Sequence, residues 1–199
     1  MSGYHTKIKL YEHDALIIAD VQNDFLAGGN LVVPYGDEIL PILNRYILLF
    51  RNKGLPVFAS REWHPSNHCS FDTQGGAWPV HCVKNSYGAQ ISVRLKLAPD
   101  TVIISKASQP DLDSYSAFEG SELLTRLHER SVSRLFIGGF ATEYCVFDTV
   151  KDARSAGFTV RVLSDAVRAF DIHPGDGDRA LEDMSRLGAT FAELKEAVV

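Results

Sequence analysis

The stretch Gly138-Gly-Phe-Ala-Thr-Glu-Tyr-Cys145 follows the apolar run Leu135-Phe-Ile137 and leads into a helical pattern. This order predicts a strand that ends on glycines, a tight turn, and a helix that begins at the turn. Thr142 is a suitable N-cap, which would place Cys145 at the third position of the helix. There the helix dipole and the unpaired backbone N–H groups favour a thiolate and an oxyanion site. The alternative is a buried cysteine that only packs, and the rest of the chain has to decide between the two.

Apolar runs and helical patterns alternate in both directions from this turn. Strands separated by helices form βαβ units, so we expect a three-layer, doubly wound α/β fold with a mostly parallel sheet of about six strands. The expected strands cover residues 15–19, 56–59, 101–105, 134–137, 158–163 and 189–191. The expected helices cover residues 37–52, 121–130, the segment from the turn to 156, and 176–186.

The composition predicts one domain and excludes several classes of protein. A chain of 199 residues, 45% of them hydrophobic, suffices for a single domain over residues 1–199. The net charge of −5 gives no electrostatic reason to expect a nucleic-acid partner, and no apolar run is long enough for a membrane span. Residues 1–13 lack the apolar core of a signal peptide, so we expect a cytoplasmic protein with its cysteines as free thiols.

Four chemically active residues fall at or just after the carboxyl end of a predicted strand: Asp20, Glu62, Lys106 and Cys145. Parallel α/β sheets bind their ligands at this edge. An aspartate within hydrogen-bond reach can take the proton of a cysteine, and a lysine stabilises the thiolate. An aspartate or lysine after a strand is usually a turn residue or a solvated charge, but the shared placement favours a catalytic set. No G-x-G-x-x-G follows the first strand, so a dinucleotide site is not predicted.

The irregular stretch over residues 60–90 carries a second set of chemically active side chains. Glu62 and His64 are two residues apart, so in an extended segment their side chains point the same way. His81 would complete a set of two histidines and one carboxylate with open positions for water, which suits Zn²⁺, Fe²⁺ or Mn²⁺. A Glu-x-His pair alone is a weak signal. His68 is either a further ligand or a residue that orders the loop by hydrogen bonding.

Six motifs appear along the chain in a fixed order. They are Asp20-Val-Gln-Asn-Asp-Phe25; Arg61-Glu-Trp-His-Pro65 with His68 and Ser70-Phe71; Trp78-Pro-Val-His-Cys82; Lys106; Asp113-Ser-Tyr-Ser-Ala-Phe118; and Gly139-Phe-Ala-Thr-Glu-Tyr-Cys-Val146. Together, over residues 15–191, they resemble the nicotinamidase/pyrazinamidase branch of the isochorismatase-like cysteine hydrolases. The resemblance implies hydrolysis of nicotinamide, and of pyrazinamide, through a cysteine thioester in NAD salvage. It also implies a small-molecule amide as the partner and a homo-oligomer.

The resemblance further implies roles for single residues. Cys145 matches the nucleophile, Asp20 the proton shuttle and Lys106 the third member of the triad. Ala141 and Cys145 match the two residues whose backbone N–H groups form the oxyanion hole, with a cis Phe140–Ala141 peptide that aims them.

The resemblance also implies a substrate pocket and a metal. Phe25 and Trp78 match the aromatic residues that sandwich the pyridine ring, with ordinary core packing as the alternative. Glu62, His64 and His81 match the metal ligands, and zinc is the expected metal, with iron or manganese as alternatives. Glu62 stands where the family pattern has Asp, so its direct coordination is a weaker expectation than that of the two histidines.

Three other functions compete with this interpretation. The chain would otherwise be a related amidohydrolase that acts on another small amide, such as an N-carbamoyl compound or ureidoacrylate, although the metal set favours a pyridine carboxamide. Isochorismate hydrolysis is less expected, because the vinyl-ether chemistry of that branch does not use this cysteine. A non-catalytic module on the same fold is the third possibility, and the intact set of Asp20, Lys106 and Cys145 argues against it.

Overall fold

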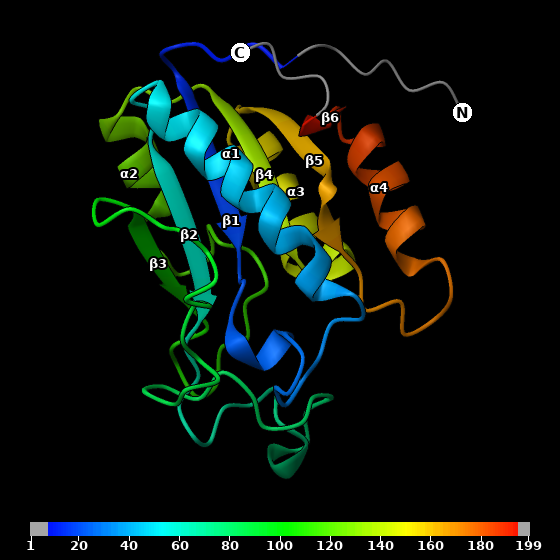
Figure 1. Ribbon diagram of the computed structural model, residues 1–199. Helices are drawn as coiled ribbons and strands as arrows, with labels where there is room; N and C mark the ends of the chain where they lie inside the picture. The colour runs from blue at the N-terminus through cyan, green and yellow to red at the C-terminus, as the bar shows by residue number, and fades with distance from the viewer. Residues whose placement is uncertain (1–7, 195–199) are drawn as a thin grey trace.

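The computed structural model describes residues 8–194 and is built around a six-stranded sheet (Figure 1). The strand order is β3-β2-β1-β4-β5-β6, and every neighbouring pair is parallel. The strands are β1 (Asp14–Ala19), β2 (Val57–Glu62), β3 (Val102–Lys106), β4 (Arg134–Phe140), β5 (Thr159–Arg168) and β6 (Thr190–Ala192). The predicted α/β fold with a parallel sheet is confirmed.

Helices cover both faces of this sheet. The core of one face contains α1 (Leu40–Asn52), and the core of the other contains α2 (Leu123–Glu129), α3 (Phe147–Ser155) and α4 (Asp176–Arg186). Shorter helical turns are η1 (Asn23–Phe25), η2 (Gly36–Ile39), η3 (Asp72–Gln74) and η4 (Thr142–Val146). The three-layer arrangement is therefore confirmed. Within residues 8–194, no helix combines the length and the apolar character that a membrane crossing needs.

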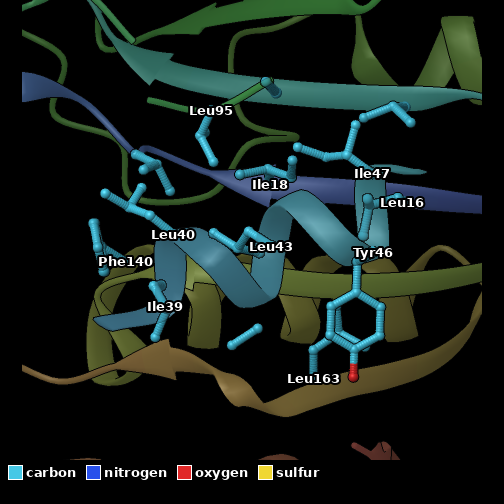
Figure 2. Close-up of a cluster of buried hydrophobic side chains, with 14 of the residues drawn as sticks. Leu16, Ile18, Ile39, Leu40, Leu43, Tyr46, Ile47, Leu95, Phe140 and Leu163 are labelled. Atoms are coloured by element: carbon cyan, nitrogen blue, oxygen red, sulfur yellow. The ribbon is translucent and has the colours of Figure 1, made fainter. Parts of the chain in front are cut away.

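Helix α1 shows why these residues form an amphipathic helix. Pro41 lies in the first turn, where its missing N–H costs nothing, and Leu43, Ile47 and Phe50 recur on one buried face. Figure 2 shows Leu43 and Ile47 in one cluster with residues of β1. Tyr46 is also buried, and its hydroxyl donates to Asp165 Oδ1 at 2.9 Å, which satisfies the polar end of the ring.

The strand order reverses between β1 and β4, the point where parallel sheets bind their ligands. Ala19 pairs with Gly139 across this junction. Gly139 has φ of 124°, and a Cβ atom there would lie 2.1 Å from the carbonyl oxygen of Ala19, so the position requires glycine. The close approach places the segments after β1 and β4 next to each other. Strand β4 runs through both glycines to Phe140, three residues beyond the predicted end at 137.

The long irregular segment after β2 lies below the carboxyl ends of the strands (Figure 1). Buried polar side chains from the segment after β1 fix it in place. Asp24 Oδ2 accepts the backbone N–H of Cys82 at 2.7 Å, and Gln22 Nε2 donates to the carbonyl of Ala89 at 2.9 Å. Because these side chains satisfy backbone groups that have no sheet partner, the segment holds a defined path without regular structure.

Candidate active site

The structure brings Asp20, Lys106 and Cys145 together at the carboxyl edge of the sheet. Asp20 directly follows β1, Lys106 ends β3, and Cys145 lies in η4 after β4. The Lys106 ammonium is at the centre, 3.2 Å from Asp20 Oδ2 and 3.4 Å from Cys145 Sγ. It also donates to the carbonyl oxygen of Ser114 at 3.0 Å. All three side chains are buried, so their charges interact without screening by water.

Lys106 and Asp20 form the charged part of this set. Burial lowers the pKa of Lys106, but the charges of Asp20, Cys145 and Glu62 outweigh it and raise that pKa well above its usual range. Burial also raises the pKa of Asp20, against the opposing charge of Lys106. The Ser60 hydroxyl donates to Asp20 Oδ1 at 2.8 Å. The other oxygen, Oδ2, pairs with the ammonium, and the carboxylate lies within reach of the Cys145 thiol, whose proton it can accept.

Cys145 is a protonated thiol in this environment. Burial raises its pKa; Lys106 lowers it, while the charges of Asp20 and Glu62 raise it further, and the net pKa lies well above the ordinary value. Desolvation and the two carboxylates therefore oppose the thiolate that the start of the helix favours. A base has to remove this proton before the sulfur can attack.

The turn before Cys145 differs from the predicted helix start. Ala141 has an extended backbone and occupies the N-cap position, and its carbonyl accepts the N–H groups of Tyr144 at 3.2 Å and Val146 at 3.1 Å. The five residues from Thr142 form a π-helical turn, so Thr142 is not the N-cap and Cys145 is the fourth residue of the turn. Such turns are rare and frequent at functional sites.

The expected cis peptide before Ala141 is also wrong. Residues 8–194 contain no cis peptide bond, so the Phe140–Ala141 peptide is trans. The trans form is favoured by about 3 kcal/mol for a residue other than proline, and the positive φ of Gly139 already turns the chain here. Ala141 and Cys145 still lie side by side on the wall of one pocket, and the oxyanion role of their N–H groups stays a prediction.

The second predicted set, Glu62, His64 and His81, also comes together. Glu62 Oε2 lies 3.0 Å from His81 Nε2 and 3.6 Å from His64 Nε2. His64 Nδ1 is bonded to the carbonyl of His81 at 3.1 Å, and His81 Nδ1 to the carbonyl of Pro79 at 2.8 Å. A carbonyl only accepts, so each Nδ1 carries a hydrogen. His81 Nε2 is also hydrogen-bonded to the Glu62 carboxylate, which only accepts, so this ring donates from both nitrogens. Burial lowers the pKa of His81, but the hydrogen bond and the charge of Glu62 outweigh it and raise that pKa.

This arrangement fits a divalent cation. His64 Nε2 is buried and has no hydrogen-bond partner among the described residues. Burial lowers the pKa of His64 to about 4, so this ring is neutral. Burial raises the pKa of Glu62, but Lys106 and the two histidines outweigh it and hold that pKa well below its usual range. Two imidazole nitrogens and a carboxylate, with ligand atoms within 4.8 Å of one another, form a set that suits zinc.

The isochorismatase domain model matches residues 14–196, nearly the whole chain. The chain belongs to the isochorismatase family. The nicotinamidase of Escherichia coli (strain K12) is 38% identical over 203 residues, which are 92% of this chain and 95% of the E. coli protein.

Two solved structures share the fold closely. The pyrazinamidase of Pyrococcus horikoshii in complex with zinc is 48% identical, with a TM-score of 0.88, over 92% of this chain and 99% of that chain. PnC1 from L. infantum in complex with nicotinate is 36% identical, with a TM-score of 0.89, over 96% and 98% of the two chains. Within this family, the fold thus carries zinc in one relative and nicotinate in another.

Glu62, which stands where the sequence resemblance led us to expect an Asp, contacts both sets of this isochorismatase-family site. While Oε2 faces the two histidines, Oε1 lies 3.2 Å from Lys106 Nζ and 3.5 Å from Cys145 Sγ. The additional methylene thus lets one carboxylate reach the ammonium and the thiol as well as the imidazoles.

His68 and Gln22 support this site from outside it. Both ring nitrogens of His68 are bonded, Nδ1 to Ser70 Oγ at 2.7 Å and Nε2 to the Leu112 carbonyl at 3.2 Å, and its ring stacks on His64. These bonds favour the loop-ordering role of His68 over the ligand role. Gln22 Oε1 accepts the N–H of Glu62 at 2.8 Å, and Nε2 donates to the Glu62 carbonyl at 2.8 Å. Sequence reasoning assigned no role to Gln22, although it stands in the first quoted motif.

A small aromatic pocket opens beside Cys145. Phe25 and Trp78 line it, as expected, together with three aromatic residues to which sequence reasoning assigned no role: Tyr115, Tyr144 and Phe170. The Trp78 indole donates to the Tyr115 hydroxyl at 2.9 Å, which fixes the orientation of the indole. Tyr115 and Tyr144 belong to quoted motifs and were therefore detectable. Phe170 lies outside all six motifs, and no sequence signal pointed to it.

Proposed function

We propose that this protein hydrolyses nicotinamide to nicotinate and ammonia, with Cys145 as the nucleophile. One observation carries the proposal: Cys145, which is in contact with the buried Asp20–Lys106 pair, lines a pocket with aromatic walls. The cluster supplies a nucleophile and a proton acceptor, and the aromatic walls suit a flat ring. The nicotinamidase and pyrazinamidase relatives support the same reaction. The reaction would place the protein in NAD salvage, and pyrazinamide is expected to react as well.

The first half of the reaction forms a thioester. Asp20 Oδ2 takes the thiol proton of Cys145, and the sulfur attacks the carboxamide carbon of the substrate. Lys106 remains an ammonium and balances the negative charge as the proton moves. The N–H groups of Ala141 and Cys145 donate to the oxyanion of the tetrahedral intermediate, an effect worth about 3 kcal/mol for each donor. The intermediate collapses when Asp20 returns the proton to the amide nitrogen and the C–N bond breaks, which releases ammonia.

The second half regenerates the enzyme. Asp20, now a carboxylate again, takes a proton from a water molecule that attacks the thioester carbon. The C–S bond breaks, nicotinate forms, and Cys145 recovers its proton from Asp20. The same carboxylate thus serves both halves, with its Oδ2 beside the Lys106 ammonium.

Glu62, His64 and His81 would hold one divalent metal, most readily zinc because imidazole and carboxylate ligands suit it. When bound, the metal supplies a Lewis acid for the ring nitrogen of the substrate. The protein itself orients the ring between Phe25 and Trp78.

Ammonia release from nicotinamide, measured with and without a chelator, tests the proposal. We expect turnover, and Cys145→Ala should reduce it by about 10⁴-fold or more. The matched control is Cys69→Ala, because Cys69 is half-buried outside the pocket and should be dispensable. Normal turnover by Cys145→Ala would end the nucleophile assignment. Hydrolysis of an N-carbamoyl compound or ureidoacrylate in place of nicotinamide would assign the chain to another amidohydrolase, and metal binding without any turnover would indicate a binding module.

A further inference from the structure

Phe170 contacts both of the rings expected to sandwich the substrate. It lies in the loop between β5 and α4, and its ring stacks on Trp78 at 5.7 Å with an interplanar angle of 30°. It meets Phe25 edge to face at 6.2 Å and Tyr144 edge to face at 6.0 Å. Phe170 is therefore the residue that joins the two predicted walls of the pocket.

The pocket beside Cys145 is too small for a pyridine ring as it stands. Its volume is about 20 Å³. That space suffices for about one water molecule, whereas a benzene-sized ligand occupies a cavity of about 150 Å³. A side chain of the wall therefore has to move before a ring can reach the thiol.

Of the five aromatic residues around the opening, Phe170 is the least constrained. Trp78 is held by its bond to Tyr115, Phe25 is buried in η1, and Tyr144 is part of the π-helical turn. The ring of Phe170 is half-buried and carries no polar group that would anchor it. Rotamer changes of such partly exposed side chains are fast compared with catalysis.

The backbone that carries Phe170 is, by contrast, firmly attached. Glu143 Oε1 accepts the N–H of Asp171, the residue after Phe170, at 2.9 Å. Asp171 Oδ1 then accepts the N–H of Gly177 at 2.8 Å, at the start of α4. Glu143 belongs to the same turn as the nucleophile, so it fixes the loop relative to Cys145 while the ring of Phe170 stays free to rotate.

We propose that Phe170 is the specificity-determining gate of the pocket and that Glu143 positions it. The ring swings aside to admit a flat amide and then closes as the outer wall beside Trp78, so its size limits which rings reach Cys145. The identity of the substrate class, a flat aromatic amide, rests on the proposed function. The gate itself does not, because it controls access of any reagent to the thiol.

Alkylation of Cys145 tests the gate independently of the enzymatic reaction. Iodoacetamide and N-phenylmaleimide serve as the small and the bulky reagent, and peptide mass spectrometry separates Cys145 from Cys69 and Cys82. Phe170→Ala should increase the ratio of the bulky to the small rate by about tenfold, the size of effect that a hydrophobic pocket exerts on ligand size. The matched control is Ile172→Ala, because Ile172 belongs to the same loop but is 55% exposed and does not line the pocket.

An unchanged ratio in Phe170→Ala, or an equal rise in Ile172→Ala, would overturn the gate. Phe170→Leu, which keeps most of the volume and packing, should give an intermediate ratio and guards against a simple folding defect. In the enzymatic assay, Phe170→Ala should raise KM for nicotinamide more than it lowers kcat.

The positioning role of Glu143 is tested by the same ratio. Glu143→Ala removes the acceptor for the Asp171 N–H and should raise the ratio, whereas Glu143→Gln keeps an acceptor oxygen and should restore it. A wild-type ratio in Glu143→Ala would overturn the positioning role. If the wild-type protein releases no ammonia from nicotinamide but the alkylation ratios behave as expected, the proposed function fails and the gate stands.

Discussion

Glu62 Oε1 lies 3.2 Å from the ammonium nitrogen of Lys106. The other oxygen of the same carboxylate lies 3.0 Å from His81 Nε2. One side chain therefore joins the candidate metal site to the candidate catalytic triad. An aspartate at this position would have a shorter reach.

The double role of Glu62 predicts a loss of metal affinity when its charge is removed. Glu62→Gln should bind zinc about 10- to 100-fold more weakly or worse, the range found when the surroundings of a metal ligand are altered. Competition with a chromogenic chelator measures the affinity directly. Glu122→Gln is the control, because Glu122 is an exposed helix-surface carboxylate that should leave zinc binding unchanged. Wild-type affinity in Glu62→Gln would show that the two histidines suffice without Glu62.

Two carboxylates, Asp20 and Glu62, lie beside Cys145, and variants of each can show which one removes the thiol proton. The thiol donates to Glu62 Oε1 at 3.5 Å, and it also lies within reach of Asp20. Because Glu62 is assigned to the metal, Asp20→Asn should lower the rate of acyl-enzyme formation by about 10²- to 10⁴-fold. Rapid quenching followed by mass spectrometry detects the thioester on Cys145. Near-normal thioester formation in Asp20→Asn, together with loss in metal-loaded Glu62→Gln, would assign the base to Glu62.

We expect removal of the Lys106 charge to lower the free energy of unfolding strongly. Lys106→Met would leave Asp20 and Glu62 buried without their shared cation, and breaking a buried ion pair in this way costs about 3–5 kcal/mol. The free energy of unfolding in urea measures the loss. The matched control is Lys151→Met, because Lys151 makes an exposed pair with Asp148 that is worth about 0–1 kcal/mol. Equal losses in the two variants would contradict a stabilising role for the buried cluster.

The sequence predicted those parts of the site that depend on strand ends. In a parallel sheet the carboxyl ends of all strands meet at one edge, so Asp20, Glu62, Lys106 and Cys145 had to approach each other once the strands were located. The periodicity of residues 176–186 likewise predicted α4 with its observed bounds. These features follow from local pattern and topology.

Features that depend on tertiary contacts were not predictable in the same way. The π-helical turn follows from two N–H groups that share the carbonyl of Ala141, which no local pattern encodes. The raised pKa of Cys145 depends first on burial, and its two carboxylate neighbours add to it. Phe170 reaches the pocket because Glu143 fixes a loop that follows a different strand.

We predict that the metal site depends on Gln22, although Gln22 is not one of the candidate metal ligands. Its amide holds both backbone groups of Glu62, and leaving buried groups unpaired costs about 1–3 kcal/mol each. Gln22→Leu should therefore lower the free energy of unfolding and weaken zinc binding, because the carboxylate of Glu62 loses its fixed position. Urea denaturation of the zinc-free protein and chelator competition separate the two effects. Asn23→Leu is the control, because Asn23 makes an exposed bond to the Tyr87 carbonyl and does not contact Glu62. If Gln22→Leu loses stability but keeps the zinc affinity of the wild type, Gln22 only holds the loop and does not position the ligand.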